Sequence, residues 1–360
     1  MLSILSVYLG VSRGCGVKAV VVIMFFVAIV AVFLLTEWSF RRFVSPKIRD
    51  IFENVPPFNV IPEPENPDAQ RIEFRTSDGL LLRGSLLNAD VPDPPALVLF
   101  LPELHGSHWT ARRYCDALLK QRYMVLSFDF RNQGESESMV GYLPIHWMTE
   151  YEMTDVEAAL EFVESNHKLD SLPLVAFGVS RGGVAALLTG CRYPRIRAVI
   201  ADSAFGTMAM IRFFVDRFVQ HVIPGWLFAL LPNWHIKITL KQGVQLSEAG
   251  RKCHYAHLDD EVKGLESANV LLISGARDSY VTPVIARKLH EVIGKKAELW
   301  LVPGAKHNMS RAVQTEEYDR RIVDHFERCL NPPVVAVAAT SDSRKAAHRQ
   351  ITPVVVSDAT

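Results

Sequence analysis

Short apolar runs alternate with longer stretches of helical character along most of the chain. Two runs, at 71–76 and 80–87, flank Ser77-Asp78-Gly79, a short turn that suits an antiparallel hairpin. Six more apolar runs are separated by segments of helical periodicity, at residues 96–101, 124–128, 172–177, 196–201, 270–274 and 297–302. Continuous apolar strands between helices are typical of a mostly parallel sheet that is covered on both faces. The pattern therefore predicts an α/β fold with about eight strands.

The alternation is interrupted between residues 204 and 267. This segment contains no clear strand but many Phe, Met, Trp and Leu side chains, and it lies between two strand-helix units. We interpret it as a helical cap inserted into a folded domain of residues 71–330. From 331 to 360 the chain is rich in Val, Ala, Ser, Thr and Pro without helical periodicity, which predicts a disordered tail.

An unbroken run of 17 apolar residues, 19–35, follows the N-terminal segment of residues 1–18. At about 1.5 Å per residue the run just reaches across a hydrocarbon core, and Trp38 and Phe40 beyond it suit the interface. It predicts a single-pass membrane anchor over 19–36. A cleavable signal peptide is the alternative, although its apolar region would be shorter and followed by small residues. Because Lys and Arg flank both ends of the run, the side of the membrane that carries the folded domain stays open.

Residues 37–70 are expected to link the anchor to the folded domain. Six prolines lie between Ser45 and Asp68, too many for a helix or a central strand. The sequence therefore predicts an extended tether over this stretch.

The charge balance argues against a polyanionic partner. Lys plus Arg and Asp plus Glu both number 39, so the formal net charge is zero and no nucleic-acid partner is expected. The five cysteines are widely spaced and odd in number, which predicts neither a disulfide framework nor a zinc site. The histidines at 105, 108, 254 and 257 have no further ligand at a suitable spacing, so no metal is expected.

The sequence Gly178-Val179-Ser180-Arg181-Gly182 stands between a buried strand and a helix. In that setting a Gly-x-Ser-x-Gly motif predicts a sharp turn with the serine strained at its apex and its hydroxyl above the carboxyl ends of the strands. The two glycines are needed where a side chain would collide with neighbouring backbone. Ser180 is therefore the candidate nucleophile.

A serine hydroxyl needs an adjacent base, and the base needs an orienting carboxylate. Strand 270–274 leads into Asp278 and strand 297–302 leads into His307, each on a loop at the same edge of the sheet as Ser180. In proteins whose nucleophile lies on a Gly-x-Ser-x-Gly turn between strand and helix, the acid and the histidine follow the serine in this same order, Ser, Asp, His. Asp202, after strand 196–201, is the reserve candidate for the acid, although it also suits a helix N-cap.

An oxyanion would need two backbone donors. One is the N–H of Arg181, the residue after the nucleophile, and the other is expected on the loop after strand 96–101. We favour Leu104 for the second donor, and the His105-Gly106 pair leaves Ser107 as the alternative.

These motifs make the chain resemble the α/β-hydrolase superfamily over about residues 71–330, and within it the serine aminopeptidase-like or Bem46-like hydrolases with an N-terminal anchor. Besides the Gly-x-Ser-x-Gly turn at Ser180, here called the elbow, the resemblance rests on segments 129–136, 275–278 and 304–307. It implies a triad of Ser180, Asp278 and His307 that hydrolyses esters, thioesters or amides. The loop 102–106 departs from the common pattern and is closer to that of dienelactone hydrolases.

The expected chemistry is acyl transfer through an acyl-enzyme, which requires no metal or organic cofactor. Phe213 and Phe214 in the cap are candidate contacts for a small apolar acyl substrate, although packing of the cap onto its own domain explains the same residues equally well. A peptidase or an acyltransferase on the same triad is an alternative function. A catalytically silent membrane-anchored scaffold is the alternative from another class.

Overall fold

Eight strands form one sheet in the order β1-β2-β4-β3-β5-β6-β7-β8. The computed structural model of the protein describes residues 13–55, 60–219, 224–262, 265, 269–294 and 297–331. β1 pairs antiparallel with β2, and β2 pairs antiparallel with β4, while all other neighbours are parallel. The prediction of an opening hairpin followed by a parallel sheet is confirmed. The strands are β1 (Gln70–Arg75), β2 (Leu81–Leu87), β3 (Leu97–Leu101), β4 (Met124–Phe128), β5 (Leu174–Val179), β6 (Ile196–Asp202), β7 (Asn269–Gly275) and β8 (Glu298–Val302).

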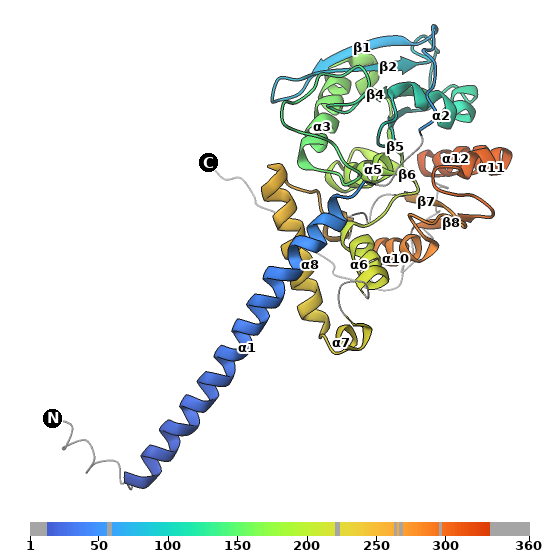
Figure 1. Ribbon diagram of the computed structural model, residues 1–360. Coiled ribbons are helices and arrows are strands. Elements are labelled where there is room, and N and C mark those ends of the chain that lie inside the picture. The colour runs from blue at the N-terminus through green and yellow to red at the C-terminus, as the bar shows by residue number, and fades with distance from the viewer. Residues whose placement is uncertain are drawn as a thin grey trace, which may run out of the picture.

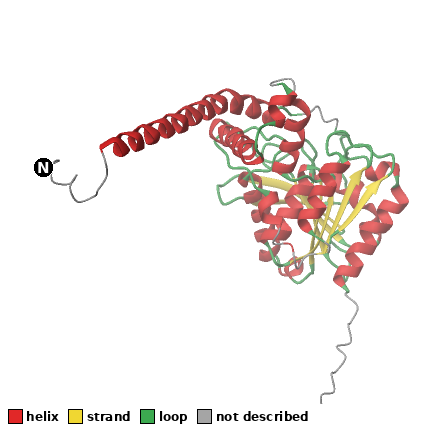
Figure 2. Cartoon of the chain, turned by 90° about the horizontal axis from the view of Figure 1, so that it is seen from below, coloured by secondary structure: helices red, strands yellow, loops and turns green. Residues whose placement is uncertain are grey.

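Helices cover both faces of the sheet, as Figures 1 and 2 show. Side chains of the central strands alternate between two buried clusters: in β3, Leu97 and Leu99 belong to one cluster and Val98 to the other. The second cluster also holds the buried faces of α2 and α12. The helices of the two layers are η1 (His108–Thr110), α2 (Ala111–Lys120), α3 (Glu150–Ser165), α4 (His167–Asp170), α5 (Arg181–Arg192), α10 (Pro283–Ile293), α11 (Ser310–Val313) and α12 (Thr315–Leu330).

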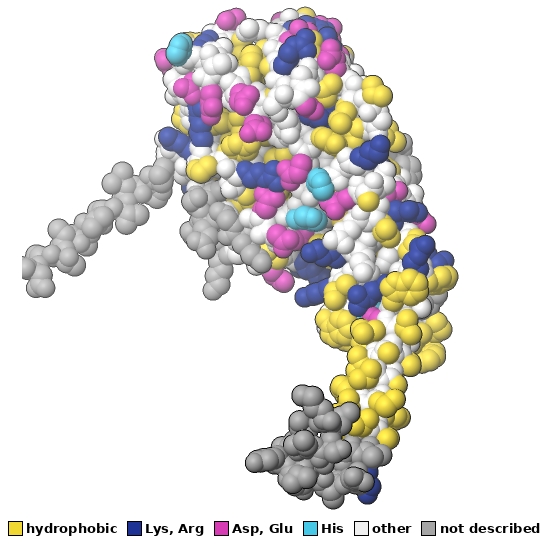
Figure 3. Space-filling view, turned by 90° about the vertical axis from the view of Figure 1, so that its left-hand side faces the viewer, with side chains coloured by type: hydrophobic (Ala, Val, Ile, Leu, Met, Phe, Trp, Pro, Cys, Tyr) yellow, Lys and Arg dark blue, Asp and Glu magenta, His cyan; other side chains and the backbone are white. Residues whose placement is uncertain are grey.

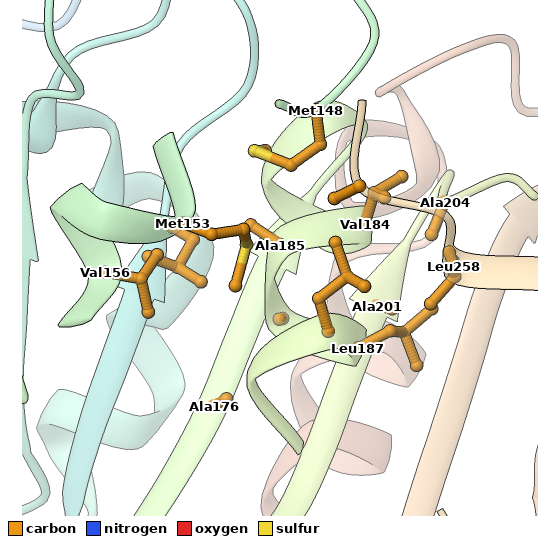
Figure 4. Close-up of a cluster of buried hydrophobic side chains, with 14 of the residues drawn as sticks. Met148, Met153, Val156, Ala176, Val184, Ala185, Leu187, Ala201, Ala204 and Leu258 are labelled. Atoms are coloured by element: carbon orange, nitrogen blue, oxygen red, sulfur yellow. The ribbon is translucent and has the colours of Figure 1, made fainter. Parts of the chain in front are cut away.

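The helix that follows Ser180 lies in the middle of the first cluster. Figure 4 shows Ala185 of α5 beside Met153 and Val156 of α3, with Ala201 of β6 on its other side. All of these side chains are at most 3% exposed. The start of α5 is therefore held by packing on two sides, which fixes the position of the residue before it.

Among the described residues, four α-helices lie between β6 and β7, where the sequence predicts a helical cap. They are α6 (Thr207–Phe218), α7 (Gly225–Ala229), α8 (Asn233–Arg251) and α9 (Leu258–Glu261). Two of the cap's last residues, 266 and 267, lie outside the described residues, as does the predicted tail apart from Asn331.

The N-terminal helix α1 spans Arg13–Glu53, and its end is packed into the domain. Phe52 is 1% exposed and stacks on Trp147 with ring centroids 4.6 Å apart, while Trp147 Nε1 donates to the Phe52 carbonyl at 2.7 Å. The predicted extended tether is therefore wrong between Ser45 and Glu53. Pro46 removes one helical hydrogen bond, but burial of Ile48 and Phe52 offsets that loss.

The first half of α1 stands away from the rest of the molecule (Figure 1). From Val20 to Leu35 its large apolar side chains are mostly more than half exposed. In the described part of the chain, this helix is the one candidate for a membrane span by length and composition, with a mean hydropathy of 3.2 over its best window. A signal sequence shares these properties.

Candidate active site

Ser180 occupies the turn between β5 and α5 in a strained backbone conformation. Its φ is 52° and its ψ is −118°, in a region that residues other than glycine rarely adopt. The neighbouring glycines are required by close approach, as the sequence predicts: a Cβ on Gly178 would lie 2.0 Å from the Gly182 carbonyl oxygen. One on Gly182 would lie 2.0 Å from the Leu101 carbonyl oxygen. The turn therefore holds the serine at the end of β5 and the beginning of α5.

Three predicted site residues are joined by hydrogen bonds. Ser180 Oγ lies 2.9 Å from His307 Nε2, and His307 Nδ1 lies 2.7 Å from Asp278 Oδ2. Asp278 follows β7 and His307 follows β8, so the parallel strands bring them to the same edge of the sheet as Ser180. An imidazole bonded at Nδ1 to a carboxylate carries its proton there, which leaves Nε2 to accept a proton from the serine.

The Asp278 carboxylate is itself fixed. Its Oδ1 accepts hydrogen bonds from the backbone N–H groups of Tyr280 at 2.8 Å and Val281 at 2.9 Å. Asp278 is 3% exposed and Ser180 is 5% exposed, so water has little access to this line of hydrogen bonds. The low local polarity strengthens each bond.

Asp202, the reserve acid, has a different set of partners. Its carboxylate accepts hydrogen bonds from Ser203, Ser310 and Tyr318 at 2.9, 3.1 and 3.0 Å. Burial raises the pKa of Asp202 to about 6, and these hydrogen bonds oppose the rise. The carboxylate ties β6 to α11 and α12, whereas the carboxylate on His307 Nδ1 is that of Asp278.

The side chain of Arg181 is turned away from the serine into the core. Its guanidinium forms an ion pair with Glu152 and lies 5.7 Å from the centre of the Phe130 ring. Glu152 also accepts from Tyr142 Oη at 2.5 Å and from the Thr149 N–H at 3.0 Å, so it completes a capping box at the start of α3. This buried network fastens the first turn of α5 to α3. The backbone N–H of Arg181, at the N-terminus of α5, has no acceptor within its own helix.

The loop after β3 carries the candidates for the second backbone donor. The N–H of His105 donates to Gln133 Oε1 at 2.8 Å, and that of Gly106 donates to the Glu103 carbonyl at 2.9 Å. Within the described residues we find no acceptor for the N–H of Leu104 or of Ser107. The backbone N–H groups of His105 and Gly106 are thus already hydrogen-bonded, whereas those of the two predicted donors, Leu104 and Ser107, are available to an oxyanion.

A row of aromatic rings leads from His307 to the cap. The Tyr280 ring lies 5.2 Å from the His307 ring in a T-shaped contact, and the Phe214 ring lies 5.9 Å from Tyr280. Phe213 follows at 5.8 Å from Phe214. The structure thus brings Phe214 nearer to the three hydrogen-bonded residues than Phe213. Sequence reasoning missed Tyr280, although its position two residues after Asp278 was a usable signal.

Comparisons with known proteins agree with this architecture. Residues 92–252 match the family described as serine aminopeptidase, S33. An esterase from Pyrococcus furiosus shares the fold with a TM-score of 0.56 and 22% identity, over 77% of this chain and 97% of that one.

Two curated relatives match shorter stretches. A probable alcohol acetyltransferase from Cyberlindnera fabianii is 32% identical over 130 residues, which is 35% of this chain and 32% of that protein. The thiohydrolase aneE from Aspergillus aculeatus is 32% identical over 146 residues, or 38% of this chain and 42% of that protein. The chain thus spans about a third of the length of the first of these relatives and less than half of the second.

Proposed function

We propose that this chain is a serine hydrolase of the α/β-hydrolase superfamily, which cleaves carboxylic esters, thioesters or amides through an acyl-enzyme. The observation that carries the proposal is the pair of hydrogen bonds from Ser180 through His307 to Asp278, starting at a strained serine on a strand-helix turn. Under this proposal Ser180 is the nucleophile, His307 the general base and Asp278 the orienting acid.

The reaction proceeds in two halves. His307 Nε2 takes the proton of Ser180 as Oγ attacks the substrate carbonyl carbon, and Asp278 stabilises the imidazolium that forms. The carbonyl oxygen becomes negative and accepts hydrogen bonds from the backbone N–H groups of Arg181 and Leu104. The imidazolium then protonates the departing alcohol, thiol or amine, which leaves an acyl group on Ser180. Water, deprotonated by the same imidazole, releases the acid and restores the serine.

A fluorophosphonate probe tests this proposal directly on the full-length chain. The probe phosphonylates an activated serine, so we expect one modified peptide, the one that contains Ser180, and loss of esterase activity in step with labelling. Failure of the native protein to react, or modification at another serine, would contradict the assignment.

For the substrate we propose an apolar acyl group that contacts the aromatic row of Tyr280, Phe214 and Phe213. Burial of apolar area contributes about 0.8 kcal/mol per methylene. We therefore expect kcat/KM for p-nitrophenyl esters to rise several-fold for every two carbons from acetate to hexanoate. Phe214→Ala or Phe213→Ala should flatten this slope, with the larger effect at Phe214 because its ring adjoins Tyr280.

A matched control is Phe228→Ala, which also removes a half-buried phenyl ring from the cap but one that faces α1. It should leave the dependence on chain length intact. A profile of kcat/KM that peaks at acetate, or a preference for aminoacyl amides over all esters, would contradict the proposed acyl-binding site and favour peptidase activity instead.

Transfer of the acyl group to an alcohol is a second candidate function, favoured by the match to a probable alcohol acetyltransferase. The near-complete burial of Ser180 is compatible with a site that limits water. Product analysis with a p-nitrophenyl ester in the presence of ethanol distinguishes the two. An acyltransferase should convert a growing share of the ester to ethyl ester as ethanol is added, whereas a hydrolase should continue to release mainly the free acid.

We also propose that α1 anchors the protein in a membrane through its apolar run. The full-length chain should remain in the membrane fraction after washing with alkaline carbonate, because about 25 Å of exposed apolar helix cannot be accommodated in water. Edman sequencing of the same material provides the control. Recovery of soluble protein that starts beyond residue 36 would indicate a cleaved signal sequence instead.

A further inference from the structure

The short helix α7 is apolar on both of its sides. Phe228 and the adjacent Leu231 line an apolar cavity together with Phe40 and Val44 of α1. On the other side, Trp226 is 69% exposed and Leu230 is 70% exposed. A helix at the surface of a water-soluble domain normally turns polar residues outward. Large exposed apolar groups next to each other instead mark a contact with another apolar medium.

The position of α7 relative to α1 follows from the pairing of α1 with α8. His235 Nδ1 lies 2.8 Å from Glu37 Oε2, and further along Ser45 Oγ donates to Gln242 Oε1 at 3.4 Å. From the first contact to the second, the residue number increases in both α1 and α8, so the two helices run parallel. The beginning of α8, with α7 just before it, therefore lies at the height of Glu37, two residues after the apolar run ends at Leu35.

The side chains at this height match those of a membrane interface. Trp234 shares one groove with Leu34 and Trp38 of α1. A run of 17 residues spans about 25 Å, slightly less than a hydrocarbon core of about 30 Å, so the residues just beyond Leu35 fall at its boundary. Tryptophan is enriched at that boundary. Three tryptophans, at 38, 226 and 234, thus lie near one level, each at least 48% exposed.

Basic side chains surround the same region. Exposed lysines and arginines of α1, α6 and α8 lie near it, namely Arg42, Lys47, Arg217, Lys237 and Lys241. The nearby acidic residues Glu37 and Asp216 are already paired, with Arg41 and Arg212. Figure 3 shows apolar side chains continuing from the stalk of α1 onto the base of the domain, with Lys and Arg side chains just above them. Exposed cations beside an apolar face favour anionic lipid head groups.

We propose that α7 and the first turn of α8 lie in the interface of the bilayer that α1 spans, with Trp226, Leu230 and Trp234 among the acyl chains and the basic residues at the head groups. The partner is a lipid surface that contains anionic lipid. This inference rests on the proposed anchor and adds a second point of contact between domain and bilayer. The cap that carries Phe213 and Phe214 is thereby held at the membrane surface, where an apolar ester would be found.

Quenching of tryptophan emission by brominated lipid tests the proposal on the full-length chain. The protein is reconstituted in vesicles of phosphatidylcholine and phosphatidylglycerol, with and without bromine on the acyl chains. The lipid-quenched part of the emission is compared between the native protein and three variants, Trp226→Phe, Trp38→Phe and Trp300→Phe. Trp226 is exposed, so its replacement should not disturb the fold. Trp300 is on the edge strand β8 and serves as the matched control.

We expect Trp226→Phe and Trp38→Phe each to lower the lipid-quenched emission by about a third, since three tryptophans share it, and Trp300→Phe to leave it unchanged. If Trp38→Phe lowers the lipid-quenched emission and Trp226→Phe does not, the cap lies outside the bilayer, which contradicts this inference but leaves the proposed anchor supported. If neither variant changes the lipid-quenched emission, the proposed anchor is contradicted as well. Protection of Trp226 from both bromolipid and aqueous acrylamide would show that protein, such as a second copy of the chain, covers this face, and would also overturn the inference.

Discussion

Replacement of Ser180 by alanine is expected to lower kcat/KM for ester hydrolysis by at least about 10³-fold and to abolish labelling by a fluorophosphonate. The loss is expected to be large because the proposed acyl-enzyme forms on the Ser180 hydroxyl, and under that proposal His307 and Asp278 act only through this nucleophile. Alanine lacks only the hydroxyl, so the elbow itself should be preserved. Initial rates with a p-nitrophenyl ester, measured with a thermal unfolding curve of the same sample, provide the test.

Ser203→Ala is the matched control for this substitution. Ser203 follows β6 as Ser180 follows β5, it is buried, and it also has a positive φ, of 57°. Its hydroxyl donates to Asp202 rather than to a histidine. The Ser203→Ala variant should still be labelled by the fluorophosphonate and should keep most of its turnover. Persistent labelling of a folded Ser180→Ala variant would refute the assignment of Ser180 as the nucleophile.

Asp278→Asn is expected to lower kcat by about 10⁴-fold. The amide oxygen can still accept the hydrogen bonds from the N–H groups of Tyr280 and Val281, so the loop should keep its shape. The group that faces His307 Nδ1 becomes an NH₂ donor, which favours the tautomer that carries its proton on Nε2. That tautomer cannot accept the proton of Ser180, and the positive imidazolium loses its counter-charge.

Asp202→Asn provides the comparison for the acid. Its partners are three hydroxyl groups, which can bond to an amide as well as to a carboxylate. We therefore expect a change in thermal stability with most of the turnover retained. A greater loss of turnover in Asp202→Asn than in Asp278→Asn would transfer the role of acid to Asp202.

The strands and the elbow could be predicted because their signals are local. A buried parallel strand is a continuous apolar run, and in β5 that run ends in the Gly-x-Ser-x-Gly sequence that only a tight strand-helix turn requires. Once the strands are known, the carboxyl ends of β7 and β8 place Asp278 and His307 on the same edge of the sheet as Ser180. The sequence favoured Asp278 for the acid and kept Asp202 in reserve, but it could not show the hydrogen bond to His307 on which that choice depends.

The parts that sequence reasoning missed depend on contacts between distant segments. Pro46 suggests a break in α1, but Gly243 of α8 allows Ile48 to approach closely, and this packing carries the helix through the proline. A Cβ on that glycine would lie 2.5 Å from Ile48 Cγ2. The ion pair of Arg181 with Glu152 likewise joins residues whose own neighbourhoods in the sequence give no sign of the contact.

The packing of α1 against the domain from Glu37 to Phe52 has a consequence for how substrate would be encountered. With the proposed span in a bilayer, this contact holds Ser180 at a constant height and tilt above the lipid, since the domain cannot swing freely on its stalk. Encounters then depend on lateral diffusion in two dimensions, and the rate should follow the mole fraction of an ester in the membrane rather than its concentration in the surrounding volume. Dilution of the vesicles in buffer would leave turnover per enzyme unchanged, whereas dilution of the ester with inert lipid would lower it.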